Sequence, residues 1–574
     1  MKLNRVSCIL AIGAGALAAA GCNLAPRYAR PTAPPSVAFK EAGPDGDAAL
    51  QGWKRAAPND AAIRTRWWEL YEDPRLDEIE ARVAISNQTI VAAEANYRAA
   101  YALAQEAQAQ LFPTLSLAPS ATREKSSRSG AVVGGGVAGA STVTAAGASA
   151  AATTGSGATT ATSGTHNLFA VPLEASYQVD LWGSIRNTVA GSRYSAQASA
   201  ATLANALLST QCTLAQDYFQ LRVADEQRRI LEATVEDYRA SLHLVRTLVD
   251  TGVDSEADAA TAESQLETAM ASATDVGVAR AQYEHAIAVL IGVAPGSFSI
   301  PYQRLDQKLP IIPVSVPSDL LERRPDIAAA ERQVAAANAQ IGVARAAFFP
   351  ALTLSGSGGY ESTAVSNLFS APNLFWSVGP SLAQILFDGG ARAAAVAQAR
   401  ALDDSQVATY RQTVLNAFQS VEDNLAALRI LATELDQSHR ATAAAARALR
   451  MTLVLYRNGI DSYVSVITAQ NALLAARETE LGVRLRQLTA SVNLINDLGG
   501  GWRSSDLEQT ERLAQHPPDA AREPEAPRTG PADLANPPPI PTEEIRLDEL
   551  MELDESMRPA PSKNNGPPRS QGDP

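Results

Sequence analysis

Cysteine is scarce in this sequence, which excludes a fold held together by disulfide bonds. Only three cysteines occur, Cys8, Cys22 and Cys212. The first lies in an N-terminal apolar run and the second directly follows that run, so no pairing framework remains for the rest of the chain. We expect Cys212 to be a small buried residue within a helix.

Basic charge, aromatic residues and long apolar runs are also lacking. Asp and Glu outnumber Lys and Arg by 61 to 48, the net charge is −13, and aromatic residues make up 5% of the chain. Nucleic-acid binding requires clustered Lys and Arg, so a nucleic-acid partner is not expected. After the N-terminal run, no apolar run reaches the roughly 18 residues of a membrane-spanning helix. If this protein spans a membrane, it must do so with β-strands.

Motifs for catalysis and for metal binding are missing as well. The five histidines lie far apart, without metal-ligand spacing, at positions 166, 243, 285, 439 and 516. The glycine run Gly134–Gly136 lacks the strand and helix of a phosphate-binding loop. We therefore predict that the protein is not an enzyme and that it needs no metal or cofactor, apart from a covalent lipid discussed next.

The N-terminus has the pattern of an export signal. Lys2 and Arg5 precede an apolar run from Val6 to Ala20, and Gly21 and Cys22 follow. Small residues directly before a cysteine resemble the lipobox of bacterial lipoproteins. This predicts a signal peptide at 1–21, a lipid on Cys22 and an extended, Pro-rich segment at 22–66. The alternative is an ordinary secretory signal with Cys22 unmodified. By the same resemblance, Asn23 indicates the outer membrane.

Proline is absent from two long intervals that follow matching stretches, Phe169–Arg186 and Phe375–Arg392. The first interval ends at Gly252 and the second at Gly459, and the two are nearly equal in length. At 1.5 Å per residue, each predicts a helix of roughly 100 Å. No compact core can bury such a rod, so we predict an elongated helical assembly with a small β part at one end.

The two halves of the chain repeat the same order of elements. Sliding the sequence along itself places Phe112-Pro113 on Phe349-Pro350, and a smaller shift places Phe169 on Phe375. The difference between the two shifts is close to the length of the uncharged Gly, Ala, Ser and Thr segment at 129–165. We predict a first repeat at 67–316 that carries this segment as a loop, a second repeat at 317–502, and a disordered acidic, Pro-rich tail at 503–574.

The predicted fold class is mostly α with a small β part, built from a duplicated helix-strand-strand-helix-helix unit. In each half we call the helix before the strands the entering helix and the helix after the glycine break the returning helix. A returning helix of about 40 residues and an entering helix of about 36 would together nearly match one long helix if stacked end to end. This arithmetic favours a barrel in which long rods alternate with stacked pairs. Four strands per chain cannot close a barrel alone, so membrane insertion would require several copies.

Several motifs in the same order resemble the TolC-like outer membrane factors, and within them the lipoprotein (NodT-type) members of tripartite efflux systems. The resemblance covers about residues 20 to 502. It is carried by the Cys22 lipobox, Trp67-Trp68 through Asp73-Pro74, the stretch at 177–183, Glu322 to Ile327, the stretch at 349–352, Phe387 to Gly390, and Tyr456 to Ile460.

The resemblance implies a homotrimer with a transmembrane β-barrel in the outer membrane and a long α-helical coiled-coil barrel in the periplasm. It implies two partners, a periplasmic adaptor and an inner-membrane transporter of the resistance-nodulation-division class. The expected function is a passive exit duct for small molecules and drugs. The alternatives are a duct for type I protein secretion and a non-conducting structural coiled-coil lipoprotein.

Three groups of residues are candidates for function. The helix breaks are expected to meet the adaptor, although Gly with Asp or Ser also serves simply to end one helix and start the next. The stretch after the second break is a candidate periplasmic constriction; there Ser465 and Thr468 stand where several family members carry an acidic ring, and Asp461 serves equally well as a helix cap. A third group marks the junctions between strands and long helices. In chain order these groups are Gly252, Val253, Asp254, Gly459, Ile460 and Asp461 for the tips; Asp461, Tyr463, Val464, Ser465 and Thr468 for the constriction; and Trp182, Gly183, Asp388, Gly389 and Gly390 for the junctions.

Overall fold

The structure is a computed structural model of the whole chain. It describes residues 23–32, 39–41, 66–125, 165–310, 312 and 323–502, which all belong to one compact unit, Met1–Gln515. The predicted signal peptide, Cys22, most of the 129–165 loop and the acidic tail lie outside the described residues.

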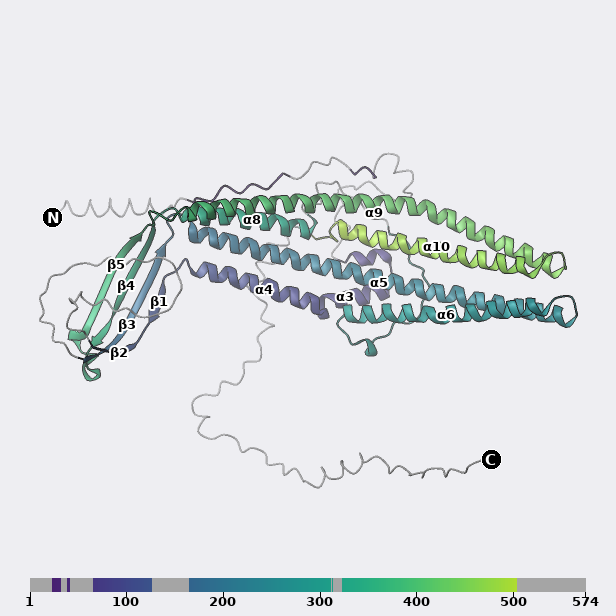
Figure 1. Ribbon diagram of the computed structural model, residues 1–574, viewed down its shortest axis with the longest axis horizontal. Coiled ribbons are helices and arrows are strands. Elements are labelled where there is room, and N and C mark those ends of the chain that lie inside the picture. The colour runs from purple at the N-terminus through teal and green to yellow at the C-terminus, as the bar shows by residue number, and fades with distance from the viewer. Residues whose placement is uncertain are drawn as a thin grey trace, which may run out of the picture. The chain divides into compact units, whose positions relative to one another are not determined.

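The described residues are mostly helical, with one antiparallel sheet, as predicted (Figure 1). The first half contains η2 (Trp67–Tyr71), α3 (Pro74–Ser86), α4 (Gln88–Ala109), β1 (Thr114–Leu117), β2 (Ser120–Lys125), β3 (Thr165–Val179), α5 (Ser184–Asp250) and α6 (Glu256–Leu290). The second half contains α8 (Pro325–Ala346), β4 (Ala351–Ser362), β5 (Leu374–Ala383), α9 (Ala391–Arg457) and α10 (Tyr463–Asp497). Short 3-10 turns, η3 (Pro295–Ser297), η4 (Val365–Asn367) and η5 (Ala371–Asn373), lie in the connections.

The two long rods expected from the absence of proline are α5 and α9, each of 67 residues. Their sequences are rich in alanine, which has the highest helix propensity and allows neighbouring helices to approach closely. At 1.5 Å per residue each rod is roughly 100 Å long. The two returning helices, α6 and α10, have 35 residues each, and the entering helices α4 and α8 have 22 each.

The entering and returning helices stack end to end, as the length arithmetic predicted. Where α4 meets the end of α6, the Asn87 amide donates to the Leu290 carbonyl at 2.7 Å. Where α8 meets the end of α10, the Arg324 guanidinium donates to the Asp497 carbonyl at 3.0 Å. In both joints the acceptor is the last residue of the returning helix and the donor is the N-cap residue of the entering helix. The chain therefore builds the same joint twice with different side chains.

One boundary differs from the expected entering helix of about 36 residues: in the first half the helix is broken at Asn87 into α3 and α4. Asn87 adopts an extended backbone conformation, and its side-chain oxygen accepts from the backbone N–H groups of Thr89 and Ile90 at 2.8 and 3.1 Å. An asparagine in this role is a helix N-cap. A local capping signal of one residue thus overrides the continuous helical pattern.

The helices form a layer in which the order is set by direct packing. Column α4/α6 packs on α5, α5 packs on column α8/α10, and that column packs on α9. Figure 1 shows these helices running side by side, with the sheet beyond one end of the rods. Among the described helices, α9 packs mainly on α8 and α10. Therefore α9 forms one free edge of the layer and α4/α6 forms the other.

The sheet has four strand positions, as predicted, but five strand segments. Its order is β1-β3-β4-β5, and β2 pairs with β3 beyond the end of β1. Ala118 and Pro119 separate β1 from β2. Proline has no N–H to donate to the ladder, which explains the interruption. All pairings are antiparallel, and both β1/β2 and β5 are edge strands.

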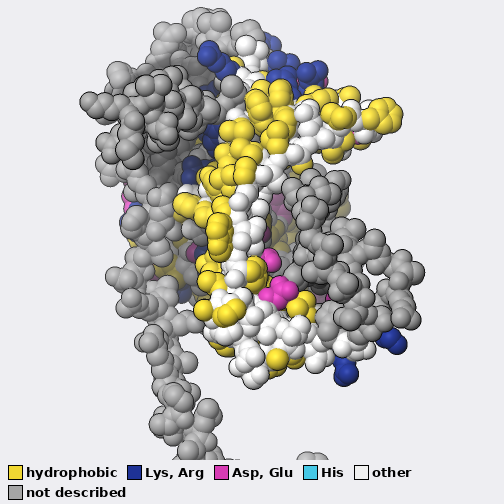
Figure 2. Space-filling view, turned by 90° about the vertical axis from the view of Figure 1, so that its left-hand side faces the viewer, with side chains coloured by type: hydrophobic (Ala, Val, Ile, Leu, Met, Phe, Trp, Pro, Cys, Tyr) yellow, Lys and Arg dark blue, Asp and Glu magenta, His cyan; other side chains and the backbone are white. Residues whose placement is uncertain are grey.

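The register of the sheet separates an apolar face from a polar one. Residues that pair directly point to the same face, so Leu117, Leu173, Gly358 and Trp376 share one side. On that side the exposed fractions of Trp376 and Val378 are 77% and 78%. Figure 2, viewed from the sheet end, shows hydrophobic side chains gathered in a band. The opposite side is mostly small and polar, although Leu168, Pro172 and Phe375 also lie on it. Its polar residues are Thr114, Ser116, Glu174, Ser176, Gln178, Thr353, Ser355, Ser357, Ser377 and Ser381.

The main core lies around the middle of α5. Trp67 and Tyr71 from η2 and Phe219 from α5 are almost fully buried there, and the rings of Tyr71 and Phe219 lie 4.9 Å apart. Cys212 is buried in the same cluster, as predicted. Among the described residues, no helix is both long and apolar enough to cross a membrane.

Candidate functional site

The two hairpin tips, where α5 turns into α6 and α9 turns into α10, use the same turn. At the first, the N–H groups of Gly252 and Val253 donate to the carbonyls of Val249 and Leu248, each at 2.9 Å. At the second, Gly459 and Ile460 donate to the corresponding carbonyls at the end of α9, again at 2.9 Å. Gly252 and Gly459 have φ of +74° and +69°. Both tips are therefore Schellman-type helix ends, which require a left-handed residue that glycine supplies.

The helices that leave the tips begin differently. At the first tip, Ser255 caps α6 by accepting from the Asp258 N–H at 3.2 Å. At the second, Ser462 is the N-cap residue but its side chain makes no capping bond. The Asp461 carboxylate accepts instead from the Ser465 hydroxyl at 2.7 Å. Asp461 thus organises the first turn of α10 through Ser465.

Apolar side chains are exposed at both tips. Val253 is 68% exposed, Ile460 is 72% exposed, and Val464 in the first turn of α10 is 63% exposed. Thr468 is exposed too, although its hydroxyl donates to the Val464 carbonyl at 2.9 Å within the helix. At both tips, these exposed side chains are free to contact another molecule.

The expectation for Tyr463 needs correction. We considered it as an apolar constriction residue, but its side chain is only 3% exposed and packs between the hairpins. Its ring lies 5.6 Å from the ring of Tyr456, and burial raises the pKa of Tyr463 to about 12. A ring enclosed by its own chain cannot narrow an open passage, which leaves Val464 as the exposed apolar candidate at this level.

One polar contact joins the two tips directly. The Tyr456 hydroxyl, at the end of α9, donates to the carboxylate of Asp254 in the first tip. Tyr456 is 5% exposed, and burial, followed by the Asp254 carboxylate, raises the pKa of its hydroxyl. A hydrogen bond to an ionised acceptor is among the stronger kinds, so this tip contact opposes separation of the two hairpins.

Further from the tips, uncharged polar side chains link the hairpins again. The Gln470 amide donates to the Ser241 hydroxyl at 2.8 Å, and both residues are buried. The Gln265 amide donates to the Asn471 side-chain oxygen at 2.5 Å. Hairpins that are joined by side-chain hydrogen bonds can separate without breaking backbone structure.

At the strand–helix junctions, aspartates start the long helices. The Asp388 carboxylate accepts from the backbone N–H groups of Gly390 and Arg392 at 3.0 and 3.2 Å, and from the Arg392 guanidinium at 2.5 Å. These bonds, that from the Arg392 side chain first, hold the pKa of Asp388 below its usual range. Gly390, with φ of +94°, is the N-cap residue. The predicted junction residue Gly389 has φ of +64°.

The first junction uses the same arrangement, with Asp180 in the role of Asp388. The sequence analysis did not name Asp180 as a candidate. Asp180 accepts from the N–H groups of Ile185 and Arg186 at 3.1 and 2.9 Å. Its position shortly before Arg186, within the matching stretch, was the available signal. The predicted residues Gly183 and Trp182 complete the junction: Gly183 is the N-cap at φ of +77°, and the Trp182 indole N–H donates to the Pro350 carbonyl at 2.8 Å.

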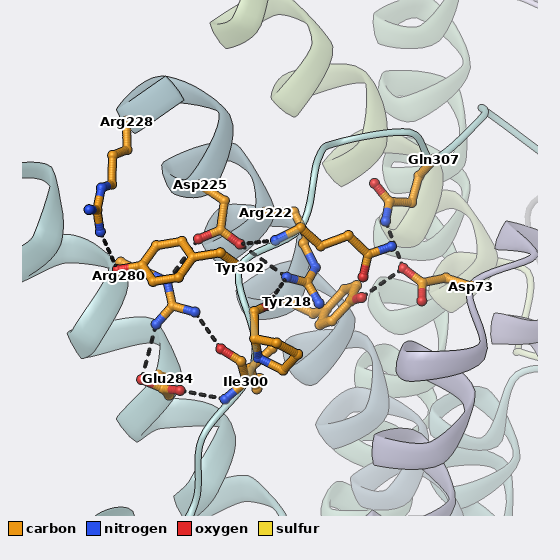
Figure 3. Close-up of polar contacts among 12 residues, drawn as sticks. Asp73, Tyr218, Arg222, Asp225, Arg228, Arg280, Glu284, Ile300, Tyr302 and Gln307 are labelled. Atoms are coloured by element: carbon orange, nitrogen blue, oxygen red, sulfur yellow. Dashed lines mark hydrogen bonds and ion pairs between the residues drawn. The ribbon is translucent and has the colours of Figure 1, made fainter. Parts of the chain in front are cut away.

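A buried charged cluster fixes the chain that connects the two halves (Figure 3). Arg280 of α6 donates to the Asp225 carboxylate at 2.8 Å and to the Ile300 carbonyl at 2.5 Å. Its guanidinium also lies 3.8 Å from the centre of the Tyr302 ring. Arg222, fully buried, donates to Asp225 at 3.0 Å. These contacts hold residues 300–302 against α5 and α6.

A second polar group continues the same connection toward η2 and α3. The Asp73 carboxylate accepts from the Tyr218 hydroxyl at 2.7 Å and from the Gln307 amide at 2.6 Å.

The sequence analysis did not predict the charged cluster around Asp225 or the polar group around Asp73. The i,i+3 spacing of Arg222 and Asp225 and the i,i+4 spacing of Arg280 and Glu284 were visible, but such pairs usually lie on solvated helix faces. Within the described part of the chain, no cluster of three potential metal ligands occurs.

Comparison with known proteins connects this arrangement to outer-membrane channels. A family model described as outer membrane efflux protein matches residues 81–293 and 316–500. The pyoverdine export outer membrane protein OpmQ of Pseudomonas aeruginosa is 30% identical over 464 residues, which cover 80% of this chain and 92% of OpmQ. The antibiotic efflux pump outer membrane protein ArpC of Pseudomonas putida is 29% identical over 511 residues, 88% of this chain and 97% of ArpC.

A solved structure gives the same result for the fold. The outer-membrane channel OprN superposes with a TM-score of 0.73 at 27% sequence identity. The match covers 84% of this chain and 100% of the OprN chain. The family model matches most of each half of the duplicated unit.

Proposed function

The chain belongs to the outer membrane efflux protein family, and from this membership we propose that it is the outer-membrane channel of a tripartite efflux system. In this role it is a passive exit duct that crosses the periplasm. It performs no chemistry and needs no cofactor. Energy comes from an inner-membrane transporter of the resistance-nodulation-division class, and a periplasmic adaptor joins the two. The exported compounds are small molecules.

The observation that carries this proposal is the two-faced sheet with two open edges. Its apolar side suits lipid and its small polar side suits a water-filled interior, as in transmembrane barrels. Unpaired backbone groups on edge strands are very unfavourable in lipid, so β1/β2 and β5 must pair with neighbouring chains. Four strand positions per chain in a homotrimer give twelve strands and a closed barrel.

The helical layer leads to the same assembly. It ends at α9 on one side and at the α4/α6 column on the other, and each edge exposes apolar residues. On α9 these include Leu402, Leu415 and Ile430, and on the opposite edge Val91, Leu103 and Val278. Three such layers joined edge to edge form a tube below the barrel. The hairpin tips, with exposed Val253 and Ile460, then form the entrance that meets the adaptor.

A lipid on Cys22 suits this placement of the chain. The next residue, Asn23, accepts from the Asn187 amide at 3.0 Å, in the first turn of α5. That turn directly follows the first strand–helix junction. An acyl chain attached one residue earlier would therefore start beside the periplasmic end of the barrel and insert into the inner leaflet of the outer membrane.

The experiment that tests the proposal combines native mass with channel recording on the full-length, detergent-purified protein. We expect a mass of three chains and stable ion channels in planar bilayers, with a bias toward cations. A monomer that does not conduct, and whose strands remain accessible to protease in membranes, would overturn the proposal in favour of a structural lipoprotein. Labelled palmitate on the wild type, absent from Cys22→Ser, tests the anchor separately.

A further inference from the structure

The first residues of the described chain form a strap, defined as residues 23–32 and 39–41, that lies along the helical layer (Figure 1). Its beginning contacts the start of α5 through Asn23, as described above. Further on, the Leu24 carbonyl accepts from Arg345 of α8, and the Thr32 carbonyl accepts from Arg411 of α9, each at 3.4 Å. The strap thus crosses from α5 over α8 to α9.

The far end of the strap is held by charge-assisted bonds to α9. The backbone N–H groups of Lys40 and Glu41 donate to the Glu422 carboxylate at 2.7 and 3.0 Å. The Glu41 carboxylate in turn accepts from the Arg429 guanidinium at 2.5 Å. Phe39, only 4% exposed, is inserted into the main core cluster. Bonds of this kind are about twice as strong as neutral ones, so this end is firmly fixed.

The helices provide a fitted site for the first part of the strap. A Cβ atom on Gly342 would lie 2.6 Å from the Ala25 side chain and 2.5 Å from the Asn187 amide, so only glycine allows this approach. The Tyr28 hydroxyl donates to Glu331 of α8, and Tyr28 packs against a buried cluster formed by residues of α8 and α9. The strap is therefore part of the packed structure.

The strap contacts α9 at the level where α8 and α10 meet beneath it. The contacted residues 411–429 flank Asn424, which donates to the Asp497 carboxylate at 2.8 Å. Inward-facing side chains of this stretch, such as Val414 and Leu425, are buried in the core. Because the strap also contacts α5 and α8, it ties the edge helix α9 to two other helices of the layer.

We propose that the strap is an assembly element: it holds the α9 edge in place against α8 and α5 so that this edge can pack against a second copy of the chain. The proposal rests on the trimer proposed above. A chain with a detached strap keeps its fold and its lipid, but its α9 edge lacks the ties to α5 and α8 that the strap supplies. Association of copies then becomes slower and less complete, because each contact must first order the edge.

The test detaches the strap without altering the packed helices. Glu422→Ala with Arg429→Ala removes its charged contacts, and Asp423→Ala with Arg440→Ala is the control, because it removes the same charges from exposed positions on α9 that do not touch the strap. Trypsin cleavage at Arg27–Tyr28 and Lys40–Glu41 reports strap attachment, native mass reports the trimer, and palmitate labelling reports the lipid.

We expect the strap variant to be cleaved at least tenfold faster than the control and its trimer fraction in membranes to fall at least twofold, with equal palmitate labelling. Rapid cleavage with an unchanged trimer fraction would overturn the assembly role, and unchanged cleavage would show that these contacts do not hold the strap. A monomeric wild type would instead refute the proposed function.

Discussion

Among single residues, Tyr456 and Asp254 have the most direct consequence for passage through a channel. Their hydrogen bond joins the two tips, which are far apart in the sequence. A hydrogen bond to a charged group contributes about 1.5–3 kcal/mol, and about 1.4 kcal/mol corresponds to a factor of ten in an equilibrium. Tyr456→Phe removes the hydroxyl and retains the ring. We expect its open-state population in planar bilayers to rise by about tenfold.

Tyr463→Phe is the matched control for this prediction. Its ring packs against that of Tyr456 in the same cluster, but the hydroxyl is not part of the contact between the tips. We expect wild-type conductance for this variant. Equal conductance of both variants and the wild type would show that the tip contact does not restrain the entrance. If Asp461→Ala with Thr468→Ala alone raises conductance, the restraint lies in the first turns of α10.

Glu80 is a second residue with a measurable effect, because it is buried without a partner. Its side chain is 0% exposed, and among the described residues neither carboxyl oxygen has a hydrogen-bond partner. Burial, followed by the nearby Asp77, raises the pKa of Glu80 well above its usual range. The folded state therefore binds this proton more tightly than the unfolded state. This contribution favours folding below the ordinary pKa of glutamate and is lost as the pH rises above it.

Glu80→Gln mimics the protonated carboxyl, so its effect should depend on pH. At pH 4 we expect the variant and the wild type to melt at similar temperatures. At pH 7.5 the variant should be more stable, by about 1.4 kcal/mol for each unit by which the pKa is raised. Glu106→Gln, at an exposed position on α4, should show no such trend. A constant difference between variant and wild type across this pH range would contradict the assignment.

At the scale of elements, the joints between stacked helices set the length of the layer, and each depends on one glycine. A Cβ atom on Gly292 would lie 2.0 Å from the Ser86 carbonyl, and one on Gly499 would lie 2.0 Å from the Arg323 carbonyl. Both glycines also have positive φ, of +68° and +88°. We expect Gly292→Ala and Gly499→Ala each to destabilise the fold by roughly 3 kcal/mol or more.

Gly482 provides the comparison within the same layer. It lies in α10, and nothing lies within 4 Å of the position that its Cβ atom would occupy. Since alanine is favoured over glycine in a helix by about 1 kcal/mol, Gly482→Ala should stabilise the fold. Thermal unfolding of the three variants in one detergent measures the contrast. A joint variant as stable as Gly482→Ala would show that the stacked columns tolerate separation.

Helices and turns were predictable from the sequence where nearby residues determine them, whereas contacts between residues far apart in the sequence were not. The rods α5 and α9 followed from the absence of proline, and the tip turns followed from Gly252 and Gly459. The break at Asn87 was missed because one capping residue decides it. The burial of Tyr463 and its neighbour Tyr456 was missed because it depends on how two hairpins pack, and no sequence spacing encodes that distance. The charged cluster around Asp225 was missed for the same reason.

At the scale of the whole molecule, one duplicated chain forms a sheet and a helical layer that both have open edges, so neither closes on itself. One chain gives a sheet with two unpaired edge strands and a helical layer with two free edges. Each half has the same helix joints and hairpin turns, so the helices of the two halves match in length. A single chain would leave every edge exposed to lipid or water. Closure therefore depends on association, and the residues that face lipid should control association as much as those at the seams.

Val378 offers a test of this dependence because its neighbour in sequence faces the other way. Val378 lies on the apolar face of β5, and Ser377 lies on the polar face. An arginine on the lipid side of a transmembrane strand costs about 2–4 kcal/mol at the middle of the bilayer, whereas the interior tolerates it. We expect Val378→Arg to lower the amount of trimer in outer membranes severalfold, and Ser377→Arg to leave that amount unchanged while altering ion selectivity. Both are read from native mass and single-channel recordings of the same preparations. If Ser377→Arg blocked insertion and Val378→Arg did not, the sheet would face the membrane with its opposite side, and the proposed barrel would have to be reversed.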